Sequence, residues 1–285
     1  MNPLVTPAWL AAKLQDPASA AHLALLDATL PPVGVTPRVD THARYLGVHI
    51  PRARFLDIDE ISDHATALPH MLPTPEAFSA SMSALGVSDD SIIVVYEQEG
   101  VFSAPRAWWM LRVFGAQKVY MLDGGLKAWT EAGLPTESGP VSPPHLPATF
   151  HARLNEQAVV SYAQLQNQLA THHQIVDARS AGRFSGAAPE PRAGLCSGHM
   201  PGATSLPFTE LVEKGRLRSP TQLREIFAAK GIDTAQPITT TCGSGVTAAV
   251  LSLALEILDA PKTALYDGSW SEYAQHPPSI IEKSA

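Results

Sequence analysis

The feature that most constrains the fold of this chain is an internal repeat. Three motifs in the first half have counterparts in the second half, in the same order. They are Leu25-Leu26-Asp27-Ala28 with Ile175-Val176-Asp177-Ala178, His49-Ile50-Pro51-Arg52-Ala53 with His199-Met200-Pro201-Gly202-Ala203, and Leu122-Asp123-Gly124-Gly125 with Tyr266-Asp267-Gly268-Ser269. Partners are 150 residues apart in the first two pairs and 144 in the third. Such self-similarity is expected when one structural unit occurs twice, and it predicts two copies of one domain.

A proline-rich stretch separates the two copies. Five of the thirteen residues from Pro135 to Pro147 are proline, and proline lacks an amide donor and disfavours helix before it. The stretch is therefore typical of an extended linker. With 285 residues, the chain has the length of about two domains. We expect a first domain at residues 1–134, a linker at 135–157 and a second domain at 158–285.

Within each copy, short apolar or β-branched runs alternate with longer helical patterns. The expected strands are residues 23–26, 92–95 and 119–122 in the first copy, and 174–176, 238–241 and 264–266 in the second. Helical patterns lie between them, for example at 104–114 and 246–258. This alternation predicts an α/β fold in which a mostly parallel sheet is flanked by helices. Such sheets bind ligands beyond the carboxyl ends of their strands, so the chemistry is expected there.

Composition excludes several classes of protein. The chain is 45% hydrophobic and 16% charged, which is typical of a folded protein rather than a disordered one. Its net charge of −7 makes nucleic acid an unexpected partner. No apolar run is long enough to span a membrane, and the first residues lack the basic start of a secretory signal. Two cysteines cannot form a disulfide scaffold, and we expect a cytoplasmic location.

The strongest candidate for chemistry is Cys242. It follows the β-branched run 238–241 and opens the loop Cys242-Gly243-Ser244-Gly245-Val246-Thr247, after which an apolar helix begins. Glycine lets such a loop curl inward, and unpaired N–H groups at a helix start favour an anion. Because this environment activates a thiol, we expect Cys242 to be a thiolate that lies open to solvent. The alternative is a small buried cysteine in a turn.

Cys196 and the first copy carry weaker signals. No helix start stands beside Cys196, and we interpret it as a small side chain without a chemical role. Its spacing from His199 would suit zinc, but no second pair of ligands stands at a suitable distance. In the first copy Tyr96 occupies the position expected for the thiol, and Glu97 and Glu99 follow it. Such a loop is poorly suited to an anion, so we expect the first domain to be catalytically inactive.

These motifs resemble those of the two-domain rhodanese-type sulfurtransferases, and within that family those of the group that uses 3-mercaptopyruvate. The resemblance covers the chain from about Trp9 to Tyr273. Besides the loop 242–247, it rests on Phe102-Ser103-Ala104-Pro105-Arg106-Ala107-Trp108-Trp109, Asp177-Ala178-Arg179, Arg183-Phe184-Ser185-Gly186 and Glu190-Pro191-Arg192-Ala193-Gly194. It implies tandem rhodanese-like domains of which the second is catalytic. One departure is Arg52, which stands where the family motif has glycine.

The resemblance also implies a mechanism. Cys242 would attack the sulfur of 3-mercaptopyruvate, release pyruvate and hold the sulfur as a persulfide until a thiol or cyanide accepts it. Arg183 and Arg192 would hold the carboxylate and carbonyl oxygens of the substrate, because a guanidinium meets a carboxylate with two parallel hydrogen bonds. The alternative for both arginines is a structural ion pair, with Asp177 or Glu190 for example.

Further site residues follow from the same resemblance. The backbone of Gly243, Gly245, Val246 and Thr247 would surround the bound donor. Ser244 would donate a hydrogen bond or relay a proton, or it would only cap the backbone of its loop. Asp40 and His49 match a pair assigned to work with the loop serine in this family. A structural place beside a turn is the alternative for His49 and for its repeat partner His199.

The donor and the acceptor are less constrained than the fold. Family members that prefer thiosulfate carry basic residues after the cysteine, whereas this chain has the neutral Gly243 and Ser244, which favours 3-mercaptopyruvate over thiosulfate. A cysteine phosphatase needs an arginine in its loop, and this loop has none. A non-catalytic binding module would not need the intact Cys242. Thioredoxin, glutathione or cyanide could accept the sulfur, and no metal or organic cofactor and no membrane is expected.

Overall fold

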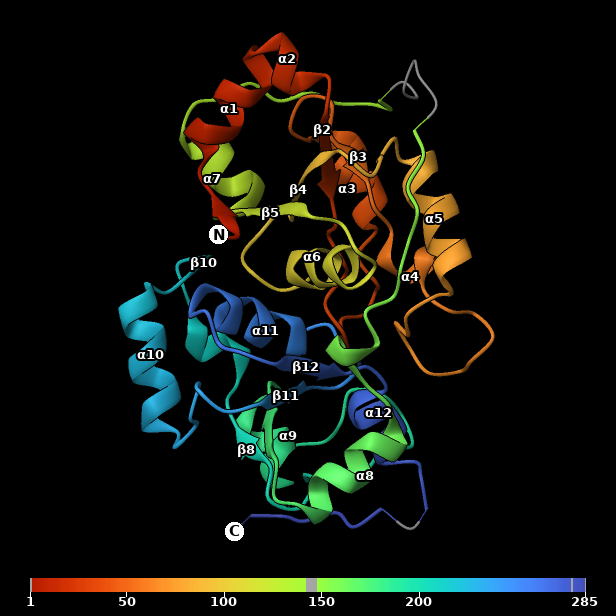
Figure 1. Cartoon of the computed structure of the whole chain (residues 1–285), viewed down its shortest axis with the longest axis vertical. Helices are drawn as coiled ribbons and strands as arrows, with labels where there is room; N and C mark the ends of the chain where they lie inside the picture. Colours follow the sequence, from red (N-terminus) through yellow and green to blue (C-terminus); the bar gives the residue numbers. More distant parts are fainter. Residues whose placement is uncertain (1, 142–147, 278, 285) are drawn as a thin grey trace. The chain divides into compact units, whose positions relative to one another are not determined.

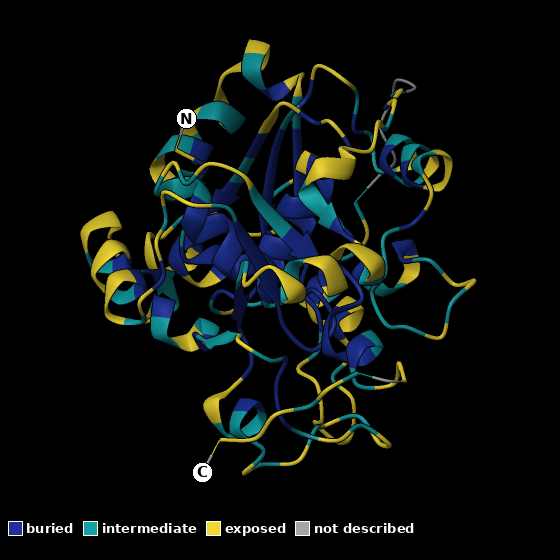
Figure 2. Ribbon diagram, turned by 60° about the horizontal axis from the view of Figure 1, so that its bottom comes forward, coloured by how far each residue is buried: buried dark blue, intermediate teal, exposed yellow. Residues whose placement is uncertain are grey.

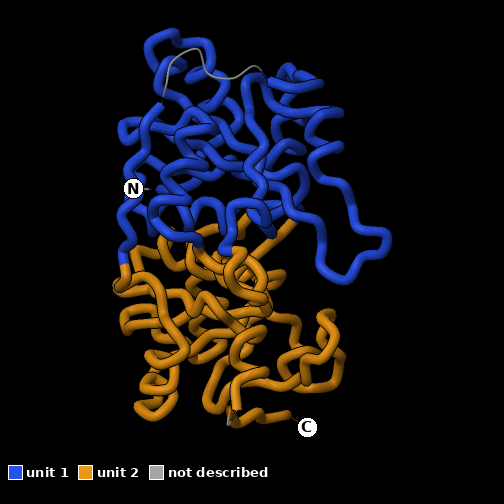
Figure 3. Tube along the Cα trace, turned by 90° about the vertical axis from the view of Figure 1, so that its right-hand side faces the viewer, with its two compact units in different colours: residues 1–63, 73–155, 214–216 blue, residues 64–72, 156–213, 217–285 orange. Residues whose placement is uncertain are grey.

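The computed structural model describes residues 2–141, 148–277 and 279–284. The chain divides into two compact units, which Figure 3 distinguishes by colour. Unit 1 comprises residues 1–63, 73–155 and 214–216, and unit 2 comprises residues 64–72, 156–213 and 217–285. Most of the expected linker is thus counted with unit 1, while its residues 142–147 lie outside the described residues. Among the described helices, none has the length and apolar character that crossing a membrane requires.

Unit 1 is built on a parallel sheet of five strands in the order β1-β5-β4-β2-β3 (Figure 1). The strands are β1 Leu4–Val5, β2 Leu23–Asp27, β3 Arg54–Phe55, β4 Ile92–Tyr96 and β5 Lys118–Leu122. In their register, Leu23 pairs with Ile92 and Asp27 with Tyr96. All residues of β2 and β4 after the first are buried, as expected for central parallel strands that are covered on both faces.

Seven helices of unit 1 flank this sheet in the described ranges. They are α1 Pro7–Gln15, α2 Pro17–Ala20, α3 Thr41–Gly47, α4 Ile58–Ile61, α5 Pro75–Ala84, α6 Ala104–Val113 and α7 Gly125–Glu131. Several of these helices have an N-cap residue whose side chain accepts a hydrogen bond from a backbone N–H, such as Asp40 at α3 and Thr74 at α5. In Figure 2 the central strands are mostly dark blue, and most exposed residues lie on helices and loops. Val94, Leu122 and Trp129 belong to the buried core.

Unit 2 repeats the same sheet. Its strands have the order β6-β12-β11-β7-β8 and are all parallel. They are β6 Val159–Val160, β7 Gln174–Asp177, β8 Thr204–Ser205, β11 Ile238–Thr241 and β12 Thr263–Tyr266, and β9 Val212–Glu213 and β10 Arg216–Leu217 form a separate two-stranded ribbon. Thr241 pairs with Asp177, as Tyr96 pairs with Asp27 in unit 1. The strand order therefore confirms the duplication that the sequence predicted.

The helical elements of unit 2 are η1 Glu156–Ala158, α8 Tyr162–Ala170, α9 Ala181–Ser185, η2 Phe208–Leu211, α10 Pro220–Ala229, α11 Ala248–Ile257 and α12 Ser269–Tyr273. Capping boxes begin α8 and α10, where Ser161 and Ser219 each exchange hydrogen bonds with a glutamine three residues later. The first eight residues of α11 are buried, which makes this helix part of the core rather than a surface helix.

The predicted α/β class and the predicted strands are confirmed. Strand β11 has the predicted bounds, and β2, β4, β5, β7 and β12 differ from them by one residue at one end. Each unit also includes a short segment from the other half of the sequence, since residues 64–72 belong to unit 2 and residues 214–216 to unit 1. The boundaries expected from the proline-rich stretch do not include this exchange.

Arg52, the departure from the family motif, occupies a left-handed conformation. Its φ is 68°, and its repeat partner Gly202 has a φ of 72°. Residues other than glycine adopt this backbone conformation at a cost in free energy. Arg52 is held there by its own N–H, which donates to Glu137 at 3.0 Å, and by its guanidinium, which donates to the carbonyl of Ala20 at 2.9 Å.

Candidate active site

The loop that carries Cys242 connects β11 to α11. The loop comprises residues 242–247, and α11 begins at Ala248. Gly245 has a φ of 78°, a conformation that favours glycine and lets the chain turn into the helix. Cys242 is only 2% exposed. The expectation of a thiol open to solvent is therefore wrong, and a donor has to enter the protein to reach the sulfur.

The backbone of this loop is arranged around the hydroxyl of Ser269. The Ser269 Oγ accepts the N–H of Cys242 at 3.3 Å and that of Gly245 at 3.0 Å, and it donates to a carbonyl at the end of β12. The N–H groups of Val246 and Thr247 have no acceptor in the part of the chain that the structure describes. Unpaired N–H groups before a helix attract negative charge, so the loop offers donors to an anion.

Arg183 and Arg192 both lie beside the loop. A Cβ atom built on Gly243 would lie 2.8 Å from Nη2 of Arg183 and 3.6 Å from Nη1 of Arg192. The Nη2 group of Arg192 also donates to the Ser244 Oγ at 3.2 Å. The structure thus brings both predicted arginines to the predicted loop, and the missing side chain of Gly243 leaves space for them.

Arg183 belongs at the same time to a buried network of ion pairs. Glu190 binds Nη2 of Arg183 at 2.6 Å and Nη1 of Arg179 at 2.8 Å. Arg179 pairs with Asp177 at 2.6 Å and lies 4.0 Å from the ring centre of Trp270. Burial opposes the charge on Arg179, but the two carboxylates outweigh it and raise the pKa of Arg179 above its ordinary value. Arg183 therefore forms the structural ion pair with Glu190 that the sequence offered as an alternative. Sequence reasoning did not predict that Arg179 shares this carboxylate.

The hydroxyl of Ser244 contacts a histidine that sequence reasoning did not single out. The Nδ1 atom of His70 lies 2.9 Å from the Ser244 Oγ. His70 lies in the segment 64–72, whose last residue, Leu72, donates its N–H to the Asp267 carboxylate at 2.8 Å. Asp267 stands at the end of β12 in the repeated motif. The only sequence signal for His70 is its occurrence in a stretch without helical or strand periodicity.

Asp40 and His49 have other contacts in unit 1. Asp40 caps α3 by accepting the N–H of Ala43 at 2.8 Å. The His49 Nδ1 faces the carbonyl of Tyr45 at 2.9 Å, its Nε2 has no hydrogen-bond partner in the described chain, and its backbone pairs with Glu137. The histidine seen beside Ser244 is therefore His70 rather than His49, and a part for Asp40 and His49 in the chemistry stays a prediction.

His199, the repeat partner of His49, is held in the same way. Its Nδ1 faces the carbonyl of Phe184 at 2.9 Å, its ring stacks on that of Phe184, and its backbone pairs with Glu282. Equivalent contacts at both copies of the motif indicate that this histidine fastens a late segment of each repeat to its domain.

The corresponding loop of the first domain shows that Glu97, not Tyr96, occupies the position of the thiol. Strand β4 continues one residue further than expected and ends at Tyr96. The next residue is Glu97, whose carbonyl accepts the N–H of Leu126 at 3.0 Å, just as the carbonyl of Cys242 accepts that of Trp270 at 2.9 Å. The assignment of Tyr96 to this position is therefore wrong by one residue.

The first-domain loop also holds a carboxyl group, and its raised pKa agrees with the expectation that this loop is poorly suited to an anion. The Glu97 side chain accepts the N–H groups of Phe102 at 2.7 Å, Ser103 at 3.1 Å and Ala104 at 3.1 Å. Burial raises the pKa of Glu97 from 4.5 to about 7, although these hydrogen bonds favour the charged form. The N–H groups at the start of α6 thus donate their hydrogen bonds to a side chain of the protein itself.

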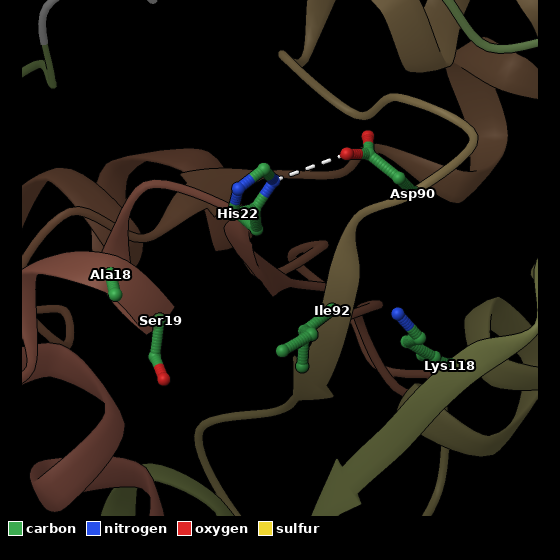
Figure 4. Close-up of a pocket in the computed structure, with 6 residues that line it drawn as sticks. All are labelled: Ala18, Ser19, His22, Asp90, Ile92 and Lys118. Atoms are coloured by element: carbon green, nitrogen blue, oxygen red, sulfur yellow. Dashed lines mark ion pairs between the residues drawn. The ribbon is translucent and has the colours of Figure 1, made fainter.

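Other candidates lie away from this chemistry. Cys196 is exposed, and no cluster of three or more metal-ligating side chains occurs among the described residues. A pocket of about 340 Å³ in unit 1 is lined by Ala18, Ser19, His22, Asp90, Ile92 and Lys118 (Figure 4). It includes an ion pair between His22 and Asp90 at 3.1 Å. Because it lies at the amino ends of β4 and β5, it is not at the edge where parallel sheets bind ligands.

Comparison with known proteins places the chain in a family. The model of the rhodanese-like domain matches residues 6–132 and 161–276. The chain therefore belongs to the rhodanese family, with the domain present twice. This agrees with the two sheets of equal strand order.

Individual relatives cover nearly the whole chain. A 3-mercaptopyruvate sulfurtransferase of Escherichia coli K12 is 46% identical over 268 residues, which cover 93% of this chain and 92% of that protein. A thiosulfate sulfurtransferase of Bos taurus is 40% identical over 280 residues, covering 96% and 93%. The crystal structure of SseA from Escherichia coli, reported for the "Rhodanese" fold and catalytic mechanism of 3-mercaptopyruvate sulfotransferases, matches with a TM-score of 0.85 at 43% identity. The match covers 95% of this chain and 99% of that one.

Proposed function

We propose that the protein is a sulfurtransferase that takes sulfur from 3-mercaptopyruvate through a persulfide on Cys242. The Cys242 thiolate attacks the sulfur of the donor, so that an S–S bond forms and the carbon–sulfur bond breaks. The electron pair leaves with the carbon fragment as the enolate of pyruvate, which a proton converts to pyruvate. An acceptor thiolate or cyanide then takes the outer sulfur and restores Cys242.

The observation that carries this proposal is a thiol at the start of the loop before α11, where backbone N–H groups have no acceptor within the described chain. The first domain provides an internal comparison, because the N–H groups before α6 hold the carboxyl group of Glu97. In the second domain Cys242 replaces that glutamate, and the corresponding N–H groups of Val246 and Thr247 have no acceptor in the described chain. A persulfide or an anionic donor is the partner that such groups favour.

Arg183 and Arg192 support the choice of an α-keto acid as donor. Both guanidinium groups lie against Gly243, where a side chain would collide with Arg183. A donor that reaches Cys242 therefore meets two groups that bind carboxylate and carbonyl oxygens. Ser244, bound to both Arg192 and His70, is suited to donate a hydrogen bond to the leaving enolate and to pass a proton to it.

The acceptor and the compartment belong to the proposal as well. A thiol such as thioredoxin or glutathione, or cyanide, completes the cycle, and the two half-reactions predict ping-pong kinetics. Cys196 is exposed and unpaired, which fits a reducing compartment such as the cytoplasm.

The direct test is the mass of the intact protein after treatment with 3-mercaptopyruvate. We expect a gain of one sulfur atom that peptide mapping locates on Cys242, release of pyruvate in equal amount, and loss of both in Cys242→Ser. The variant Cys196→Ser serves as the matched control and keeps the gain. If no sulfur is gained from any donor, the proposal is wrong, and a phosphatase or a binding module has to be considered.

Thiosulfate tests the choice of donor, because it has neither a carboxylate nor a carbonyl group. We expect Arg192→Ala to lower kcat/KM for 3-mercaptopyruvate by about tenfold to a hundredfold, the equivalent of one or two hydrogen bonds to a charged group. The loss for thiosulfate is expected to be smaller. Steady-state rates with both donors check this, and equal losses would contradict the assignment of Arg192 to the carboxylate.

A further inference from the structure

Arg183 is fixed on one edge before any donor arrives. Its Nε donates to Oε1 and Oε2 of Glu190 at 3.1 Å and 3.2 Å, and its Nη2 donates to Oε2 at 2.6 Å. A guanidinium has five N–H donors in a rigid plane. Glu190 therefore takes the edge formed by Nε and Nη2, and the edge formed by Nη1 and Nη2 stays available.

The Nη2 atom of Arg183, which the two edges share, lies beside the catalytic loop. The Nη2 atom of Arg183 is 2.8 Å from the point where a Cβ on Gly243 would lie. The family resemblance implied that Arg183 binds its substrate with two parallel hydrogen bonds. Because Glu190 occupies the edge formed by Nε and Nη2, these bonds have to come from Nη1 and Nη2. The direction of this edge is decided by Glu190.

Glu190 is itself held on its other side. Its Oε1 accepts from Nη1 of Arg179 at 2.8 Å, and its side chain is 1% exposed. Arg179 is in turn bound by Asp177 and by the carbonyl of Gly198 at 2.7 Å. Because every member of this chain of contacts is buried except Arg183, which is 23% exposed, only the last guanidinium projects from a rigid base.

We propose that Glu190 is a positioning residue that sets the donor selectivity of the enzyme. It aligns the free edge of Arg183 with the oxygen atoms of an α-keto-acid donor over Gly243. The inference rests on the proposed function, since it concerns recognition of the same donor. It predicts that Glu190 affects donors with a carboxylate and a carbonyl group more than it affects thiosulfate.

The test measures the ratio of kcat/KM for 3-mercaptopyruvate to that for thiosulfate. Glu190→Gln removes the charge, and Glu190→Asp keeps the charge but moves it away by one methylene. We expect the ratio to fall by about tenfold in both variants, mainly through KM for 3-mercaptopyruvate, which is the effect of losing one well-placed hydrogen bond. Glu213→Gln, which removes an exposed ion pair with Arg218 at 3.3 Å, is the control and keeps the ratio of the original protein.

The aspartate variant separates position from charge. If the ratio falls in Glu190→Gln but not in Glu190→Asp, the negative charge alone matters and the proposal is overturned. It is also overturned if both donors lose kcat/KM equally, because a purely structural role would affect them alike.

A second route approaches the same contact from Arg183, and its first step needs no Glu190 variant. Arg183→Lys has a single nitrogen that cannot hold Glu190 and the donor together, and we expect it to lower the same ratio. In a double-mutant cycle, Glu190→Asp then adds no further loss to Arg183→Lys. Additive losses, or an unchanged ratio in Arg183→Lys, would overturn the proposal. Persulfide formation in the unaltered protein tests the proposed function separately.

Discussion

Cys242 and Cys196 have the same side chain in opposite surroundings. Cys242 follows β11 and is 2% exposed, whereas Cys196 lies exposed in a loop of unit 2. Reaction with a reagent requires access as well as ionisation. At the scale of the residue, the thiol that we propose to carry sulfur is therefore buried, and the thiol without a proposed role is exposed.

This difference predicts how the two thiols react with a bulky aromatic disulfide. We expect Cys196 to react rapidly and Cys242 at least about tenfold more slowly, because the reagent has to enter the protein to reach the second thiol. The release of the coloured thiol from the reagent follows both phases. In Cys196→Ser the fast phase should disappear while sulfur transfer continues. Two phases of equal rate would contradict the burial of Cys242.

Gly243 is the residue whose missing side chain admits the arginines. In Gly243→Ala the new Cβ would lie 2.8 Å from Nη2 of Arg183, so the guanidinium has to move away. We expect KM for 3-mercaptopyruvate to rise about fivefold or more and the free energy of unfolding to change by less than about 1 kcal/mol. Steady-state kinetics and urea denaturation check the two parts.

The control for this change is Gly47→Ala. A Cβ on Gly47 meets no atom within 4 Å, and the residue lies in α3 of unit 1. We expect its kinetics to equal those of the original protein. A normal KM in Gly243→Ala would mean that Arg183 does not need its present place.

Residues that are distant in the sequence account for most of what sequence reasoning missed in the site. Cys242 could be predicted because a strand, a glycine loop and a helix follow one another directly, whereas Arg183 and Arg192 are predicted only because the family resemblance implies them. His70 is separated from Ser244 by 174 positions, and no periodicity marks its segment. The bridge from Glu190 to Arg179 and Arg183 depends on how a loop folds back on α9, which a pattern of residues does not specify.

At the scale of the element, the loops after β4 and β11 differ in what binds their backbone N–H groups. Each has N–H groups at the start of a helix. In the first domain Glu97 fills them, and Gly125 is required nearby, because a Cβ there would lie 2.1 Å from the carbonyl oxygen of Glu97. In the second domain Ser269 replaces that glycine and binds the loop with its hydroxyl.

The buried Glu97 predicts a pH dependence of stability. Its pKa is about 7 in the folded protein and 4.5 ordinarily, so the folded state binds the proton more tightly. The contribution of Glu97 to the free energy of unfolding is therefore fully present below pH 4.5, and it is lost as the pH rises to 7. It amounts to roughly 3 kcal/mol of unfolding free energy over that range. In Glu97→Gln this loss should be absent, which urea denaturation at several pH values measures.

Glu99→Gln is the matched control for Glu97→Gln. The Glu99 side chain is 74% exposed and pairs with Arg44 at the surface. Its replacement should leave the pH dependence as it is in the original protein. If Glu97→Gln also keeps the decline between pH 4.5 and 7, another group causes it.

Element boundaries explain the one-residue error in the first domain. The sequence predicts a strand that ends at residue 95, which places Tyr96 at the first position of the loop. Tyr96 instead pairs with Asp27 as a strand residue, and a shift of one position moves the counterpart of the thiol from tyrosine to glutamate. The repeat itself contained the correction, since Asp27 and Asp177 are partners and Thr241 pairs with Asp177.

At the scale of the whole molecule, the duplication and the α/β class could be predicted because they depend on motifs and periodicity. The exchange of segments could not. Residues 64–72 belong to unit 2 and residues 214–216 to unit 1. Each is fastened by an aspartate of the repeated motif, Asp267 to the Leu72 N–H at 2.8 Å and Asp123 to Arg216 at 2.7 Å.

The exchange predicts that the second half of the chain is not sufficient for activity. Residues 156–285 contain Cys242, both arginines and Ser244 but lack His70 and Leu72. We expect this fragment to melt at a lower temperature than the full chain and to form persulfide at least about tenfold more slowly. Thermal denaturation and intact mass check this. A fragment as active as the full chain would show that the segment 64–72 is dispensable.

The contact between Asp123 and Arg216 also bears on synthesis at the ribosome. Every strand of the N-terminal sheet has been synthesised once residue 122 has been added to the chain. Arg216, the partner of Asp123, is added 93 residues later and can pair only after it has left the exit tunnel. The nascent N-terminal unit can therefore form its sheet early, yet it is completed only when most of the C-terminal half has been produced.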